Sequence, residues 1–233
     1  ITGSPVGIFV FGPQASANIH DNLSSIHGNV IGIDVDGGTS IITLNHIYDN
    51  GIGIRFTNAG TGTVSVNKFD GVTKNGKDIQ GTATAGTITA TPNNWLAGTT
   101  FGIENLSAST IDAKLNYWNA VSGPGPVGPG SGANVTTNVD YCPWLNGVPV
   151  PLGGAGISTT LTVTVGVVET SGVANNDGII CTGASVTLNT GGITGSPMYL
   201  WAPGGQTTAA INVSPIVTTT YTVTVTQGGC TAT

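Results

Sequence analysis

The chain has 233 residues and a formal net charge of −6, and only 7% of its residues are charged, against about 25% in a typical soluble domain. Five basic residues cannot form the basic face of a nucleic-acid-binding protein, and a hydrophobic content of 39% argues against disorder. No run approaches the ~18 apolar residues of a membrane span, so neither nucleic-acid binding nor membrane insertion is expected. Abundant glycine and β-branched residues favour an all-β fold.

A 21-residue repeat lies near the start of the chain. Ile33 and Val35 recur as Ile54 and Phe56, each in an alternating apolar pattern. A fixed period of this length is typical of a solenoid, in which each repeat forms one coil on top of the last. The alternation predicts strands whose aliphatic side chains fill a common interior.

Three charged residues face the other way in these strands and form the candidate ligand-binding group. Asp34 and Arg55 hold the same position in successive repeats, so we expect them to be neighbours on adjacent coils, with Asp36 beside them. Side chains at these positions are expected to face solvent. The alternative to a binding site is an exposed ion pair of about 0–1 kcal/mol.

Asparagines recur after an inward Leu or Val, as Asn45, Asn67 and Asn116. Asparagine adopts left-handed backbone conformations readily and bonds nearby main chain. We therefore predict a structural ladder along the coil axis; the alternative is an outward ligand-binding row. The threonine-rich run 82–91 spans too few aligned coils to predict the regular threonine rows of an ice-binding face.

Two segments carry a family resemblance. Residues 45–56, NHIYDNGIGIRF, resemble the repeats of right-handed parallel β-helix proteins related to pectate lyases. Residues 116–145, NYWNAVSGPGPVGPGSGANVTTNVDYCPWL, resemble the segment that closes such helices in secreted bacterial proteins. The resemblance covers about residues 15–147 and implies a β-helix over 1–150. Its last coil would be capped by Trp118, Tyr141 and Trp144, because an open coil edge invites aggregation.

Residues 151–158 have the composition of a linker, and short alternating strands return over 159–233. Their spacing predicts a small β-sandwich. The segment 181–230 resembles the Ig-like or PKD-like modules of large exported surface proteins of the Bacteroidetes type, often carried by type IX secretion. Cys181 and Cys230 flank this segment, so a disulfide between them is one candidate, which the sequence leaves open.

The functional hypothesis is a non-enzymatic segment of a large secreted or cell-surface protein, an adhesin or structural spacer whose partner is carbohydrate or another surface. One alternative is a fragment of a polysaccharide lyase or glycoside hydrolase with its catalytic coils upstream. Lyases of the resembled family bind calcium through acidic residues and use Arg or Lys as the base. A second alternative is passive cargo of a secretion machine. No catalytic residue, metal ligand or cofactor is assigned, although the oxygens of 175–177 suit calcium.

Overall fold

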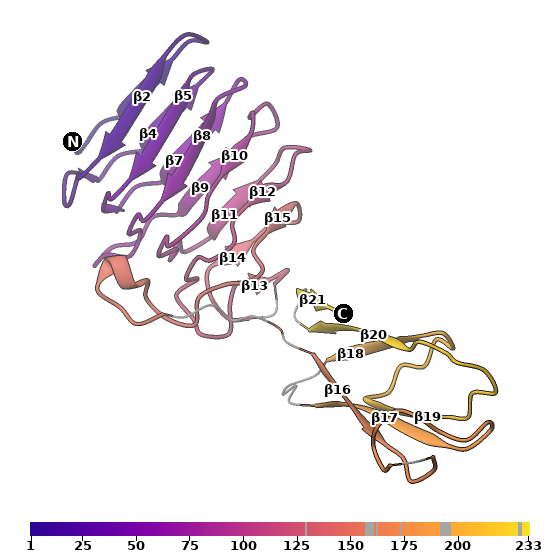
Figure 1. Cartoon of the computed structure of the whole chain (residues 1–233). Coiled ribbons are helices and arrows are strands. Elements are labelled where there is room, and N and C mark those ends of the chain that lie inside the picture. Colours follow the sequence, from indigo (N-terminus) through magenta and orange to yellow (C-terminus); the bar gives the residue numbers. More distant parts are fainter. Residues whose placement is uncertain (129, 157–160, 162, 173, 192–196, 228–229) are drawn as a thin grey trace. The chain divides into compact units, whose positions relative to one another are not determined.

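The computed structural model describes residues 1–128, 130–156, 161, 163–172, 174–191, 197–227 and 230–233 (Figure 1). The chain divides into two units, Ile1–Thr160 and Leu161–Thr233, which are described separately. Residues 157 and 158 of the expected linker lie outside the described residues. The described part contains strands, turns and one 3-10 turn, Val150–Leu152, and no helix in it is long and apolar enough to span a membrane.

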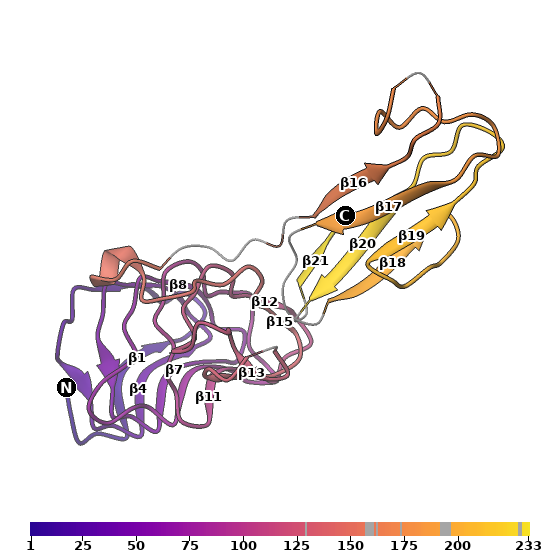
Figure 2. The same cartoon turned by 90° about the horizontal axis from the view of Figure 1, so that it is seen from below.

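The first unit is a parallel β-solenoid, as the repeat predicts. One face is a seven-stranded parallel sheet in the order β1-β4-β7-β9-β11-β14-β13, so strands far apart in sequence are neighbours in space (Figure 2). Each of the first six strands lies one coil beyond its neighbour. The strands are β1 (Val6–Phe11), β4 (Ile31–Asp36), β7 (Ile52–Thr57), β9 (Lys77–Gly81), β11 (Phe101–Asn105), β14 (Asn134–Val135) and β13 (Gly125–Pro126).

Two further parallel sheets complete the coils. Figure 1 shows the strands of the six-stranded sheet side by side in the order β2-β5-β8-β10-β12-β15. A short two-stranded sheet of β3 and β6 forms the remaining wall. These strands are β2 (Ser16–His20), β5 (Thr39–Thr43), β8 (Thr61–Ser65), β10 (Ile88–Thr89), β12 (Ile111–Asp112), β15 (Val139–Asp140), β3 (Ile26–His27) and β6 (Ile47–Tyr48).

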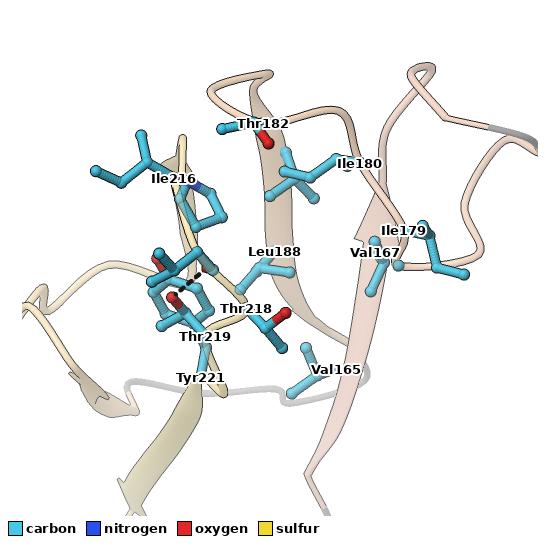
Figure 3. Close-up of a pocket in the computed structure, with 14 residues that line it drawn as sticks. Val165, Val167, Ile179, Ile180, Thr182, Leu188, Ile216, Thr218, Thr219 and Tyr221 are labelled. Carbon is cyan, nitrogen blue, oxygen red and sulfur yellow. Dashed lines mark hydrogen bonds between the residues drawn. The ribbon is translucent and has the colours of Figure 1, made fainter.

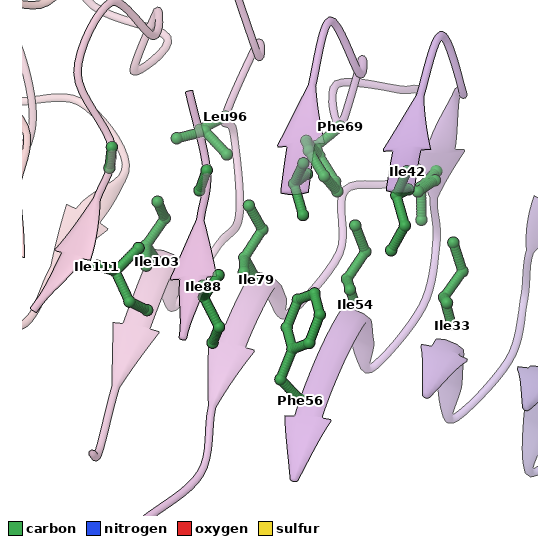
Figure 4. Packing of buried hydrophobic residues seen from close by; sticks show 14 of the residues in the cluster. Ile33, Ile42, Ile54, Phe56, Phe69, Ile79, Ile88, Leu96, Ile103 and Ile111 are labelled. Atoms are coloured by element: carbon green, nitrogen blue, oxygen red, sulfur yellow. The ribbon is translucent and has the colours of Figure 1, made fainter. Parts of the chain in front are cut away.

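The register places equivalent aliphatic side chains directly above one another. Ile33 pairs with Ile54, Ile54 with Ile79, and Ile79 with Ile103, and all four are fully buried. Figure 4 shows them pointing into the same interior as Ile42, Ile88 and Ile111 from the six-stranded sheet. Burying a side chain of this size contributes about 1.5–3 kcal/mol, so the stacked core is the main source of stability.

Buried asparagines link each coil to the next at one corner. Asn45 donates from its backbone and side-chain nitrogens to Oδ1 of Asn67, both at 3.0 Å. Asn67 repeats this toward Asn94, and Asn94 toward Asn116. Asn22 begins the same ladder by donating to Asn45. The three predicted asparagines thus lie in one inward ladder and not in an outward row, and Asn94 fills the interval between Asn67 and Asn116.

The left-handed backbone falls one residue earlier than the sequence suggested. Leu44, Val66 and Leu115 have φ of 57°, 56° and 55°, and the ladder asparagines that follow them do not. A β-branched residue such as Val66 is disfavoured in this region by about 1–2 kcal/mol. The turn is held in place by the ladder, because the asparagine that follows each of these residues must direct its side chain along the axis to bond the next coil.

A second ladder runs at another corner. Asn29 donates to Asn50 through its backbone and side chain, and Asn50 donates in the same way to Asn75. All three side chains are buried. The recurrence of Asn29 as Asn50, one repeat later, was the sequence signal for this ladder.

The second unit contains two three-stranded antiparallel sheets, in the orders β16-β17-β19 and β18-β20-β21. Its own core includes Trp201, which is 1% exposed and donates from Nε1 to the carbonyl of Thr208 at 2.9 Å. The strands are β16 (Thr164–Val168), β17 (Val186–Gly191), β19 (Ala210–Val213), β18 (Met198–Ala202), β20 (Thr222–Gln227) and β21 (Cys230–Ala232).

We predict that Asn67→Ala lowers the free energy of unfolding by about 3 kcal/mol or more, because several buried donors and acceptors lose their partners together. Urea unfolding followed by circular dichroism measures this change. The matched control is Asn18→Ala, whose side chain is exposed on β2 and whose effect should stay within about 0.5 kcal/mol. Equal effects of the two variants would contradict the structural role of the ladder.

Candidate functional site

A row of polar side chains crosses the outer face of the seven-stranded sheet. The register aligns Asp34 on β4 with Arg55 on β7, Arg55 with Gln80 on β9, and Gln80 with Glu104 on β11. The strand alternation that sends Ile33 and Ile54 inward sends these residues outward. We call these four residues, together with Lys77, the polar row.

Asp34 and Arg55 form a bidentate ion pair. Arg55 donates from Nε to Oδ1 of Asp34 at 2.9 Å and from a terminal nitrogen to Oδ2 at 2.7 Å. This hydrogen bonding raises the pKa of Arg55 above its ordinary value. The expected adjacency is therefore present, but the expected solvent exposure of Asp34 is wrong, since it is only 2% exposed. It lies in register between Arg55 and Phe9 of the neighbouring strands.

The other half of the polar row is also paired internally. Lys77 Nζ lies 2.6 Å from Oε2 of Glu104, and Gln80 donates from Nε2 to the same oxygen at 2.5 Å. Gln80 and Glu104 are both 8% exposed. Oε2 of Glu104 thus already serves two donors, and the pair is held within the sheet surface.

Asp36, the third predicted binding residue, is the last residue of β4, and its charge contributes to the raised pKa of Arg55. It accepts a hydrogen bond from Nδ2 of Asn58 at 2.9 Å and pairs in register with Thr57. The structure therefore brings Asp34 and Arg55 together but directs Asp36 to a different partner. Ligand binding by the three residues stays a prediction.

A buried carboxylate that the sequence did not reveal lies on β9, next to Lys77 of the polar row. Asp78 is 0% exposed, and its Oδ2 accepts from the backbone nitrogens of Ala97 and Gly98 at 2.6 and 2.7 Å. Its Oδ1 accepts from Asn75 at 3.0 Å, which ends the second ladder. Asp78 lies opposite Gly53, since Ile52 and Ile54 pair with its two neighbours. The sequence signal for this site was therefore the replacement of a glycine, Gly53, by an aspartate at the same position one coil later.

Burial raises the pKa of Asp78 to about 7, although its hydrogen-bond donors lower the pKa in part. Lys74 is a charged group that acts on it and also lowers the pKa. The Asp78 carboxyl therefore titrates near neutrality in a site closed to solvent. It cannot reach a ligand from there, and we assign it a structural role.

The closing segment contributes aromatic side chains to the solenoid core. Trp118 is fully buried in the solenoid core, and Tyr141 meets it edge-on with ring centroids 6.4 Å apart. Trp144 packs against the same core, and its Nε1 donates to the carbonyl of Val121 at 3.2 Å. All three side chains thus pack in or against the solenoid core, and their role as a cap stays a prediction.

The candidate disulfide between Cys181 and Cys230 is absent, because Cys181 is a free, exposed cysteine. Cys181 lies in a turn ahead of β17, whereas Cys230 begins β21 with a buried side chain. The two cysteines flank the segment in sequence, but this does not bring their sulfur atoms together.

The segment 175–177 forms a turn closed by Glu169. Asn176 donates from its backbone to the carbonyl of Glu169 and accepts the Glu169 backbone N–H on its Oδ1. The buried Glu169 carboxylate accepts from the backbone nitrogens of Ser171 and Asp177 at 2.9 and 3.0 Å. Its oxygens are thus used within the turn. Nowhere in the described part of the chain do three His, Cys, Asp or Glu residues gather as a metal site would require.

The second unit also has a cavity of about 470 Å³ near β16 and β17 (Figure 3). Val165, Leu188 and Ile216 line it with other apolar residues, and Tyr221 and several threonines add polar atoms. None of its lining residues is charged. It offers a mixed polar and apolar surface with no charged acid or base for catalysis.

Comparison with known proteins adds no assignment. No family model matches the chain, and neither a curated protein nor a solved structure matches it.

We predict that Arg55→Met lowers the free energy of unfolding by about 3 kcal/mol, because it leaves the buried Asp34 carboxylate unpaired. The control is Lys114→Met, which removes a cation paired with Asp112 and Asp140 at the exposed surface and should cost at most about 1 kcal/mol. Chemical denaturation of both variants measures the difference. A small, equal loss would show that the Asp34–Arg55 pair contributes little.

We predict that the free energy of unfolding falls as the pH rises from about 4 to about 7. In this window the folded chain holds a proton on Asp78 that the unfolded chain, with an ordinary aspartate pKa of about 3.9, has released. Urea titrations at several pH values measure the slope. In Asp78→Asn, which cannot titrate, the slope should be reduced; an unchanged slope would assign the pH dependence to other groups.

Proposed function

We propose that the chain is a non-enzymatic segment of a large secreted or cell-surface protein. The solenoid would be a right-handed parallel β-helix that serves as a stiff spacer, and the second unit an Ig-like β-sandwich module of the same protein. Carbohydrate or another cell surface is the proposed partner. Transport by a secretion machine of the type IX class fits the same proposal.

The observation that supports a spacer most directly is the continuity of the two asparagine ladders and the core along the solenoid. Each coil bonds the next through backbone pairing and buried amides, so bending between coils would break several hydrogen bonds at once. Proteases cleave exposed backbone that is not hydrogen-bonded, so backbone paired in this way is expected to resist them.

The polar row argues against the lyase alternative for these coils. A lyase of the resembled kind needs an arginine or lysine able to take a proton from the sugar and carboxylates that bind a metal. Arg55 is held by both oxygens of Asp34, and Lys77 is held by Glu104. Pairing of this kind directs both cations to carboxylates of the chain itself and occupies the carboxylate oxygens.

We predict that the chain releases neither unsaturated uronides nor new reducing ends from a panel of acidic and neutral polysaccharides, with or without calcium. Absorbance of the unsaturated product and a reducing-sugar assay measure the two outcomes. Arg55→Ala should give the same result as the unaltered chain. Product release that disappears in Arg55→Ala would overturn the proposal and favour the lyase.

A further inference from the structure

The outer face of the six-stranded sheet carries an array of hydroxyl groups. The register aligns β5 with β8 at three outward positions and β8 with β10 at one, so equivalent side chains form columns along the axis, and the central column crosses three coils. Figure 1 shows these strands side by side. The array consists of Thr39, Ile41 and Thr43 from β5, Thr61, Thr63 and Ser65 from β8, and Thr89 from β10.

The structure aligns one residue of the threonine-rich run 82–91, Thr89, with Thr63 of the preceding coil. The stretch of chain from Thr63 to Thr89 is longer than the stretch from Thr39 to Thr61, yet both pairs are aligned in the sheet. Because this coil is longer, Thr63 and Thr89 are not separated by the regular repeat length, and the sequence repeat alone does not show that they are aligned. Six of the seven positions carry a hydroxyl group, and the seventh is the exposed Ile41.

The array has a regular two-dimensional spacing that the backbone fixes. Side chains two residues apart on one strand are about 6.7 Å apart, and equivalent side chains on neighbouring strands are about 4.8 Å apart. Threonine χ1 is restricted by branching at Cβ, so its hydroxyl and methyl groups are held in place. Thr39 and Thr61 lie opposite each other in this register, and their hydroxyl oxygens, 2.9 Å apart, hydrogen-bond to each other.

The hydroxyls at the centre of the array are available to a ligand. No hydrogen bond among the described residues uses the side-chain oxygen of Thr63 or Thr89, and Thr63 is exposed. The array itself holds no charge. Charged residues begin on the next coils, where Lys114 pairs with Asp112 and Asp140.

We infer that this hydroxyl array is a binding surface for ice. A rigid, uncharged lattice of hydroxyl and methyl groups suits a periodic, uncharged surface of water molecules, because both sides repeat in two dimensions. A polysaccharide surface fits less well, since sugar rings stack on aromatic faces. The solenoid's stacked aromatic groups lie elsewhere, as in the His27–Tyr48 and Trp95–Tyr117 pairs. The inference goes beyond the proposed function, because a spacer needs no ligand on this face.

The whole chain is tested by its partition into slowly growing ice and by inhibition of ice recrystallisation in a frozen sucrose solution. We expect enrichment in the ice and small, stable crystals. Thr63→Tyr, which places a ring in the centre of the array, should abolish both effects. The control is Thr57→Tyr, the same change on the outer face of the other sheet, which should retain them.

Circular dichroism and thermal unfolding are used to check that both variants fold. Loss of ice binding by a folded Thr63→Tyr variant can then be attributed to the hydroxyl array. Exclusion of the unaltered chain from ice, or equal behaviour of the two variants, would overturn the inference. Binding to insoluble cellulose or chitin that Thr63→Tyr removes, without any effect on ice, would overturn it in favour of a polysaccharide surface.

Discussion

The stacking of coils in this solenoid depends on buried side-chain amides that bond along its axis. Within a ladder, an asparagine accepts two hydrogen bonds from the asparagine of the preceding coil and donates two to the asparagine of the following one, as Asn67 does between Asn45 and Asn94. Buried polar groups are costly unless they are satisfied, so one unmatched coil would interrupt the whole arrangement. The ladders thereby fix the register in which the aliphatic core and the outer faces are built.

Departures from the repeat show how strongly this register constrains the chain. Val66 keeps a left-handed backbone that suits a β-branched residue poorly, because the next residue must enter the ladder. Asp78 occupies a position that is glycine on the neighbouring coil, and its carboxylate ends the second ladder where Ala97 and Gly98 offer backbone donors. Both residues are explained by satisfied hydrogen bonds within the coil.

Fixed register also determines what each outer face can do. On the seven-stranded sheet it places opposite charges side by side, so the Asp34–Arg55 and Lys77–Glu104 pairs bind each other and leave little charge for catalysis. On the six-stranded sheet it aligns uncharged hydroxyl groups into a lattice. A spacer in an exported protein and a surface-binding face are compatible in one molecule, because they use different sides of the same coils.

Much of the solenoid could be predicted from the sequence, because its regular period directly encodes the stacking of Ile33 on Ile54 and of Asp34 on Arg55. The burial of individual side chains could not be predicted. Asp34 is buried because strands on both sides flank it. The threonine array was missed where coil length changes between Thr63 and Thr89, and the free Cys181 was misassigned because sequence position does not locate sulfur atoms. Function on either face depends on side-chain partners that periodicity does not specify.

Native-state hydrogen exchange of the backbone amides of Asn45, Asn67 and Asn94 tests the central claim most directly. Each of these amides donates to the side chain of the next ladder asparagine. If the ladders hold the coils together, these amides exchange only when the solenoid unfolds as a whole, with protection equal to that of the core strands. Rapid exchange through local opening, while amides in β4 and β7 stay protected, would contradict the account.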